Sequence, residues 1–140
     1  MQQSALAGAA LAVPSVLKAS ALPGFPVVRT PAAKRRFSSP AVEDTIRRMQ
    51  STIRDKELAW MFSNCFPNTL DTTVFFSRKD QKPDTFVITG DIHAMWLRDS
   101  SAQVWPYLPL RHEFPQVKYR IAGVINRQGR CSLIDAYANA

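Results

Sequence analysis

The stretch Thr89–Leu108, TGDIHAMWLRDSSAQVWPYL, gathers carboxylates, a guanidinium, an imidazole and a large aromatic ring within a few residues. It follows a β-rich run, residues 85–88, and begins with a turn at Gly90. A loop held between two ordered segments is a common position for binding residues. The candidate binding residues of this loop are Asp91, Trp96, Arg98 and Asp99.

These residue types suit a polyhydroxylated ligand. The ring of Trp96 offers an apolar face to the C–H groups of a sugar. The adjacent Arg98 and Asp99 can form charge-assisted hydrogen bonds with hydroxyl groups. On this interpretation the stretch is a sugar-binding loop.

A purely structural interpretation fits the same residues. Ser100 and Gln103 match the S-x-x-Q capping box, and Asp99 is an equally good N-cap for a short helix that follows. Asp91 after Gly90 suits a turn. The residue types alone leave the two interpretations open.

The motif resembles a signature of glycoside hydrolase family 125, the metal-independent exo-α-1,6-mannosidases, which carry a GDI-x-AMWLRDS-x-AQ-x-x-PYL-type segment. Residues 65–74, CFPNTLDTTV, and residues 133–140, LIDAYANA, are similar to the same family. The three matches occur in the family's order, and the resemblance as a whole covers about residues 40–140. His93 and Ala136 depart from the family pattern, but neither replaces a residue expected to bind sugar.

This resemblance implies a mainly α fold, the N-terminal portion of an (α/α)6 barrel with a small β-hairpin. The barrel is expected to be incomplete here, because the family fold is several times longer and the chain stops within LIDAYANA. The implied activity is inverting hydrolysis of terminal mannose from α-1,6-mannosides, with an α-mannoside oligosaccharide or N-glycan-derived substrate. A glucoamylase- or trehalase-like glycosidase, or a catalytically inactive fragment, is the alternative.

By the same resemblance, Arg98 and Asp99 are expected to hold the −1 mannose, with Asp91 and Trp96 shaping the subsite. Glycoside hydrolysis needs two carboxyls that flank the scissile bond. Eight residues across a turn fix no separation between Asp91 and Asp99, so they are not assigned as the pair. The catalytic acid and base are expected beyond Ala140, and this fragment alone is expected to be inactive.

Composition excludes some classes of function. The chain has 46% hydrophobic and 21% charged residues, which is typical of a globular protein. Its net charge of +7 is concentrated in residues 1–42, which hold five basic and no acidic side chains. The other 98 residues carry 13 basic and 11 acidic side chains without a basic stripe interleaved with aromatics. We therefore expect no nucleic-acid binding.

The N-terminal region resembles a targeting sequence. Residues 4–17 are apolar but too short to span a bilayer, and Ala19-Ser20-Ala21 fits an A-x-A cleavage site. We predict a signal peptide at residues 1–21 that lacks its basic start, and export to the periplasm or the extracellular space. Organelle targeting is the alternative, because residues 1–42 contain no acid. A Pro-rich basic linker at residues 22–39 and the truncated barrel at 40–140 follow.

Helical and strand patterns divide residues 40–140. Apolar residues at helical spacing predict a helix from Pro40 and another from Pro115. Their predicted core positions are Val42, Ile46, Met49 and Ile53 in the first, and Val117, Ile121, Val124 and Ile125 in the second. A short helix is expected at residues 57–62, a loop from Cys65, and a hairpin formed by residues 72–76 and 85–89.

No metal or cofactor is expected. Cys65 and Cys131 lack zinc-site spacing, and His93 and His112 are too few and too scattered for a metal site. In an exported protein the two cysteines could pair, but two free thiols fit the sequence better.

Overall fold

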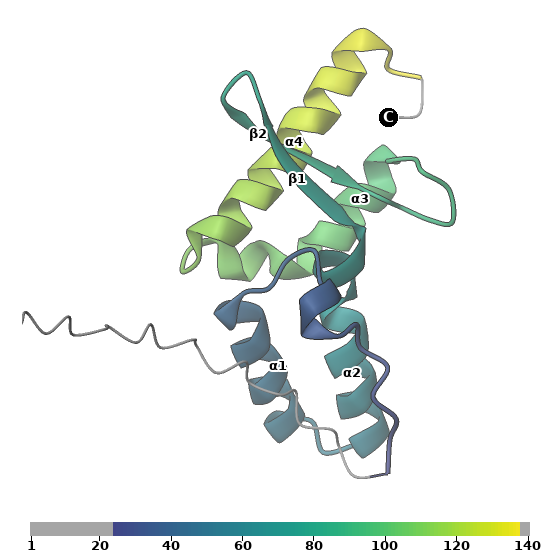
Figure 1. The fold of residues 1–140 in the computed structure, drawn as a ribbon, viewed down its shortest axis with the longest axis vertical. Helices are drawn as coiled ribbons and strands as arrows, with labels where there is room; N and C mark the ends of the chain where they lie inside the picture. The colour runs from purple at the N-terminus through teal and green to yellow at the C-terminus, as the bar shows by residue number, and fades with distance from the viewer. Residues whose placement is uncertain (1–23, 138–140) are drawn as a thin grey trace, which may run out of the picture.

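The computed structural model describes residues 24–137, which form a mainly helical fold with one two-stranded antiparallel sheet (Figure 1). This confirms the predicted mainly α class with a small hairpin. The predicted signal peptide, residues 1–21, lies outside the described residues. Within the described part, no helix combines the length and the apolar character needed to cross a membrane. The elements in chain order are η1 (Ala32–Lys34), α1 (Pro40–Thr52), α2 (Lys56–Asn68), η2 (Thr69–Thr73), β1 (Val74–Lys79), β2 (Lys82–Val87), α3 (Leu97–Val104), η3 (Trp105–Arg111) and α4 (Pro115–Ile134).

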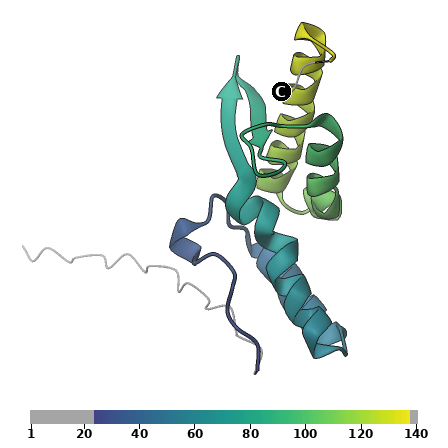
Figure 2. The same ribbon diagram turned by 90° about the vertical axis from the view of Figure 1, so that its right-hand side faces the viewer.

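Helices α1 and α2 lie side by side at one end of the molecule (Figures 1 and 2). As predicted, α1 begins with Pro40 at its first position and buries Val42 and Ile46. Helix α2 is capped by Asp55, whose carboxylate accepts a hydrogen bond from the Leu58 amide at 2.9 Å.

The prediction of a loop from Cys65 was wrong, because α2 continues through Pro67 to Asn68 and into the π-helical turn η2. Proline removes a backbone donor inside a helix and normally interrupts it. The helix is not interrupted here, and side-chain hydroxyls bind the carbonyls of the residues on either side of Pro67. The hydroxyl of Tyr107 donates to the Phe66 carbonyl, and that of Thr72 donates to the Asn68 carbonyl at 2.8 Å. Tertiary and local hydrogen bonds therefore stabilise a helix that sequence rules would end.

The predicted hairpin is present, but its strands are shifted toward the turn, because β1 begins two residues later than expected and β2 three residues earlier. Strands β1 and β2 pair in register from Val74 opposite Val87 to Lys79 opposite Lys82. Asp80 and Gln81 form the two-residue connection, with φ values of 51° and 61°. Positive φ at both central residues is the backbone geometry of the type I′ turn, which matches the twist of paired strands.

The hairpin packs against α4 (Figure 1). Val117, Ile121 and Val124 of α4 are buried, as predicted, whereas Ile125 is 63% exposed. Successive helical residues differ by about 100° in direction, so Ile125 is turned away from the face centred on its neighbours. The assignment of Ile125 to the core was therefore wrong.

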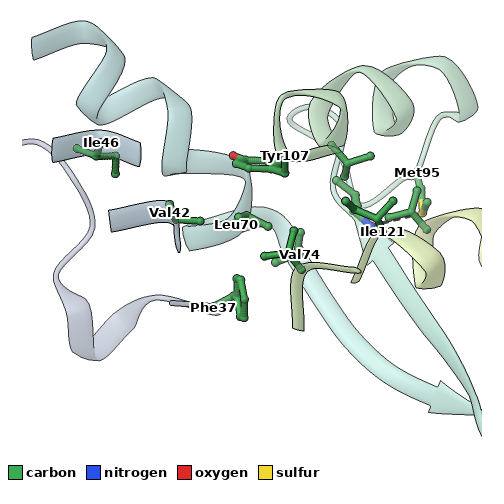
Figure 3. Packing of buried hydrophobic residues seen from close by; sticks show 12 residues of the cluster. Phe37, Val42, Ile46, Leu70, Val74, Met95, Tyr107 and Ile121 are labelled. Carbon is green, nitrogen blue, oxygen red and sulfur yellow. Dashed lines mark hydrogen bonds between the residues drawn. The ribbon is translucent and has the colours of Figure 1, made fainter. Parts of the chain in front are cut away.

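A single apolar cluster joins the two ends of the molecule (Figure 3). Phe37, Val42 and Leu70 contribute to it from the N-terminal side, and Met95 and Ile121 from the side of α3 and α4. Tyr107, which is almost fully buried, is also part of this cluster. This shared core fixes the hairpin and the loop after it relative to the helices.

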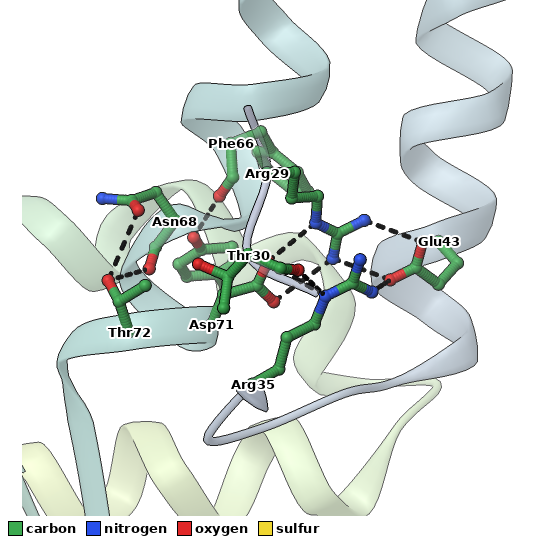
Figure 4. Close-up of polar contacts among 9 residues, drawn as sticks. Arg29, Thr30, Arg35, Glu43, Phe66, Asn68, Asp71 and Thr72 are labelled. Carbon is green, nitrogen blue, oxygen red and sulfur yellow. Dashed lines mark hydrogen bonds and ion pairs between the residues drawn. The ribbon is translucent and has the colours of Figure 1, made fainter. Parts of the chain in front are cut away.

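The segment before α1, which its composition predicts to be a linker, lies against the helices (Figure 4). The Arg29 guanidinium bridges Asp71 of η2 at 2.7 Å and Glu43 of α1 at 2.8 Å. Burial alone would lower the pKa of Arg29, but hydrogen bonds to Glu43 and Asp71 and their charges outweigh it and raise that pKa. The ring of Trp60 stacks on Phe25 at a centroid distance of 5.5 Å.

Candidate functional site

A hollow of about 340 Å³ lies between the start of α3 and the C-terminal end of α4. Figures 1 and 2 show these two helices beside each other. The first wall comes from the central motif, Met95 to Asp99, and the second from α4 and the turn after it. The lining residues of this second wall are Gln128, Cys131, Ser132, Asp135 and Ala136.

The loop before α3 is closed by Thr89. Its hydroxyl donates to the Ala94 carbonyl at 3.1 Å and accepts from the Trp96 amide at 3.0 Å. Met95 is 1% exposed, and its sulfur accepts a hydrogen bond from the Val87 amide of β2 at 3.4 Å. Because Met95 points into the core, Trp96 is directed outward and is 46% exposed. The exposed ring is thereby left available at the rim of the hollow.

The capping predictions for α3 were wrong. The helix begins at Leu97, with Trp96 as N-cap, so Asp99 and Ser100 both lie inside its first turn. The Ser100 hydroxyl donates to the Trp96 carbonyl at 2.7 Å instead of accepting from a backbone amide. Gln103 does not reach back to a cap, and its Oε1 is buried without a hydrogen-bond partner in the described structure.

Arg98 and Asp99 lie next to each other in this first turn. Their closest approach is 3.5 Å, from Nη2 to Oδ2, and their side chains are 87% and 35% exposed. An ion pair in this setting contributes little to stability, about 0–1 kcal/mol. Neither group is saturated by the pair, so both retain hydrogen-bonding capacity toward the hollow that they line.

Trp96, Arg98 and Asp99 therefore share one hollow, whereas Asp91 does not belong to its lining. Asp91 is exposed in the loop that precedes Trp96. His93, which departs from the family pattern, stacks against Phe86 of β2 at a centroid distance of 4.7 Å. The loop thus directs some polar residues toward the hollow and others toward the hairpin or solvent.

The α4 wall of the hollow was missed from the sequence. Gln128 and Ser132 lie four residues apart in α4, so they share one side of that helix, and Asp135 follows as its C-cap. This spacing is the signal that the sequence offered, but it does not show that the side chains face α3. The Asp135 carboxylate also accepts a hydrogen bond from the Tyr137 amide at 2.9 Å. Tyr137, in the same C-terminal motif, is almost fully exposed.

Both cysteines are free thiols, in agreement with the preferred sequence interpretation. Cys65 is exposed on α2, whereas Cys131 lines the hollow. Across residues 24–137, no three or more His, Cys, Asp or Glu side chains gather in an arrangement suited to a metal ion.

Comparisons with known proteins identify the family. The sequence profile described as "Metal-independent alpha-mannosidase (GH125)" matches residues 55–140, which include the whole central motif. The "Meiotically up-regulated gene 157 protein" of Schizosaccharomyces pombe (strain 972) is 42% identical over 117 residues. That alignment covers 83% of this chain and 23% of the relative, so the chain spans about a quarter of the relative's length. The chain therefore belongs to the GH125 family of metal-independent alpha-mannosidases.

Proposed function

We propose that this chain supplies the subsite for the terminal sugar in an inverting exo-α-1,6-mannosidase. The observation that carries the proposal is the convergence of Trp96, Arg98 and Asp99 on one hollow in a member of this family. In this proposal the helices and hairpin form the N-terminal part of an (α/α)6 barrel. The leader features at residues 4–21 further lead us to propose an exported protein.

Each of the three side chains has a separate role toward mannose. The Asp99 carboxylate accepts hydrogen bonds from ring hydroxyls, and the Arg98 guanidinium donates to neighbouring oxygens. The Trp96 ring covers the apolar face of the sugar. Because the groups grip the hydroxyls of a terminal residue, a longer chain on that side is excluded and action is restricted to the end. Asp91, outside the hollow, is proposed to shape only the rim of the subsite.

The bond-breaking groups are proposed to lie in polypeptide outside residues 1–140. An inverting glycosidase needs an acid and a base about 6.5–9.5 Å apart, with room for a water molecule between the base and the sugar. Asp99 in this proposal binds hydroxyls and transfers no proton. The relative's greater length, of which this chain matches 23%, leaves ample sequence for both catalytic carboxyls.

The test uses the full-length protein that contains this chain, assayed on α-1,6-mannobiose and, separately, on maltose. We expect turnover of mannobiose with release of β-mannose, observed by proton NMR of the anomeric signals. Preferential turnover of maltose would favour a glucoamylase- or trehalase-like enzyme. Turnover of mannobiose by residues 1–140 alone would contradict the placement of the acid and base.

A matched pair of variants tests the subsite. Asp99→Asn should lower kcat/KM about 100-fold or more, because it replaces a charged acceptor in the site. Asp44→Asn is the control, since Asp44 pairs with Arg47 in α1 as another exposed Asp–Arg pair, outside the hollow. Equal kinetics for the two variants would remove Asp99 from the sugar-binding site.

A further inference from the structure

We propose that Gln128 of α4 is a positioning residue that holds the first turn of α3, and with it Arg98 and Asp99, at the edge of the hollow. This inference rests on the proposed function for its effect on activity. Gln128 itself lines the hollow, so its amide lies between the two walls of the site.

The contacts of Gln128 converge on one turn. Its Nε2 lies 3.1 Å from the Leu97 carbonyl, 2.7 Å from Ser100 Oγ and 3.0 Å from Ser101 Oγ. The Leu97 carbonyl can only accept, so the side-chain atom that faces it must be the nitrogen. The amide orientation therefore follows from the chemistry of its neighbours.

The hydroxyl oxygens of Ser100 and Ser101 can accept hydrogen bonds from the Gln128 side-chain amide, because their own hydrogens are used elsewhere. The Ser100 hydroxyl donates its hydrogen to the Trp96 carbonyl at 2.7 Å, and the Ser101 hydroxyl donates to the Leu97 carbonyl at 2.8 Å. Each oxygen then keeps lone pairs for the Gln128 donors. Ser100 is fully buried, so an unmatched hydroxyl there would carry a desolvation cost. The network thus connects α4 to the start of α3 through one side chain.

This connection matters because the first turn of α3 lacks a side-chain cap, although the Thr89 hydroxyl holds the Trp96 amide before it. The N-cap Trp96 makes no side-chain capping hydrogen bond, and the helix has only eight residues. Arg98 and Asp99 lie in that turn, and among residues 24–137 their one ion-pair contact is the mutual one at 3.5 Å. Gln128 does not act as a cap, because its Nε2 donates and leaves the first amides of the helix unbound, but it holds this turn from the neighbouring helix through the Leu97 carbonyl and two serine hydroxyls.

The amide oxygen of Gln128 remains free for other use. Within residues 24–137, no donor forms a hydrogen bond with Oε1, although Nε2 is fully engaged. Because Gln128 borders the hollow, this oxygen can accept from a sugar hydroxyl or a bound water. The residue then combines the placement of Arg98 and Asp99 with one further acceptor at the same site.

Asn126 provides a matched control on the same helix. Its Nδ2 donates to the Pro83 carbonyl of β2 at 2.9 Å, which is also an amide-to-backbone bond between α4 and another element. It does not line the hollow and does not contact α3 through that bond. A change at Asn126 therefore reports the general effect of losing one such bond from α4.

The experiment compares Gln128→Met, Gln128→Glu and Asn126→Ala in the full-length protein. Methionine keeps the length of the side chain without polar groups, and glutamate removes the donors while keeping an acceptor. For both Gln128 variants we expect faster amide hydrogen exchange at Ser100 and Ser101 than in Asn126→Ala. We also expect a fall of about 10- to 100-fold in kcat/KM on α-1,6-mannobiose, because small displacements of binding groups have effects of that size.

The outcomes separate this inference from the proposed function. Wild-type kcat/KM in the Gln128 variants would overturn the positioning role, even if exchange became faster. Equal losses of kcat/KM in Asn126→Ala would also overturn it, since the effect would then be a general weakening of α4 contacts. If the wild type neither binds nor hydrolyses mannosides, the proposed function fails and the exchange result alone decides. Faster amide exchange at Ser100 in the Gln128 variants would then support the proposal that Gln128 holds the first turn of α3, and unchanged exchange would reject it.

Discussion

Gly123 of α4 lies directly against Thr85 of β2. A Cβ at Gly123 would overlap the Thr85 hydroxyl and lie 2.8 Å from its backbone nitrogen. The two backbones can approach this closely only where one residue lacks a side chain. The packing of the hairpin on α4, and so the start of the loop that leads to Trp96, depends on this contact.

Gly123→Ala is therefore expected to destabilise the chain, by about 1–3 kcal/mol, because the hairpin backbone must shift to admit one methyl group. Chemical denaturation followed by circular dichroism measures this change. Gly129→Ala is the control on the same helix, since nothing lies within 4 Å of its added Cβ. It should stabilise the chain slightly through better helix propensity, and a loss of stability as large as that of Gly123→Ala would contradict the contact argument.

Replacement of Arg29 should have a large effect on stability. Its side chain is 7% exposed and pairs with Asp71, which is 2% exposed. Arg29→Met leaves the Asp71 carboxylate with only Arg35, at 3.5 Å, and should cost about 3 kcal/mol in unfolding free energy. Arg47→Met, which breaks an exposed pair in α1, should change stability by less than about 1 kcal/mol.

A second change tests the cause of that loss. Asp71→Asn in the Arg29→Met background removes the buried charge that has lost its closest cation, so it should restore part of the lost stability. If Asp71→Asn lowers the unfolding free energy as much in the Arg29→Met background as in the wild type, the two residues are not coupled.

Stability at acidic pH should depend on Asp84. Burial alone would raise the pKa of this carboxyl, but hydrogen bonds from Arg130, at 2.8 Å, and Arg127, together with their charges, outweigh it and hold the pKa below the ordinary value of 3.8. A depressed pKa in the folded state adds stability that is present above the ordinary pKa and is lost as the pH falls through the folded one. Unfolding free energies measured from pH 7 down to pH 3 and below should therefore fall less steeply in Asp84→Asn than in the wild type. Parallel profiles would contradict this assignment.

Tyr107 should determine part of the stability at alkaline pH. Burial raises the pKa of its phenol to about 12, against the lowering effect of hydrogen bonds from Thr69 and Leu70. A raised pKa in the folded state gives stability that is complete below the ordinary pKa of about 10 and is lost as the pH rises toward 12. Tyr107→Phe should remove that alkaline loss while costing stability at neutral pH, because the bond to the Phe66 carbonyl disappears. If the wild type and Tyr107→Phe lose equal unfolding free energy between pH 10 and pH 12, the loss comes from another titrating group.

The sequence predicted the elements whose signals are local. Proline at the first position and apolar residues at helical spacing located α1 and α4, and β-rich runs around a polar turn located the hairpin. Local sequence signals gave the wrong secondary structure where residues far apart in the sequence contact each other. The α2 helix continues through Pro67, where the neighbouring Phe66 carbonyl accepts from Tyr107, 41 residues away along the chain.

The site was predicted in part for the same reason. The motif indicated Trp96, Arg98 and Asp99, which do lie together, because they are neighbours in sequence. The opposite wall, with Gln128 and Asp135, depends on α4 packing beside α3, and no pattern within either segment encodes that contact. Ser100 fits the capping pattern in the sequence, but in the structure its hydroxyl donates to the Trp96 carbonyl and accepts from no backbone amide.

The anchoring of Arg29 bears on where this polypeptide can be shortened. The proline content of residues 22–39 suggests that a shortened protein could begin at Pro40, where the first long helix begins. A version that starts there would lose Arg29 and Arg35 together and leave Asp71 a buried anion without a cation. A safe trimming point for expression therefore lies before Phe25, whose ring already stacks on Trp60.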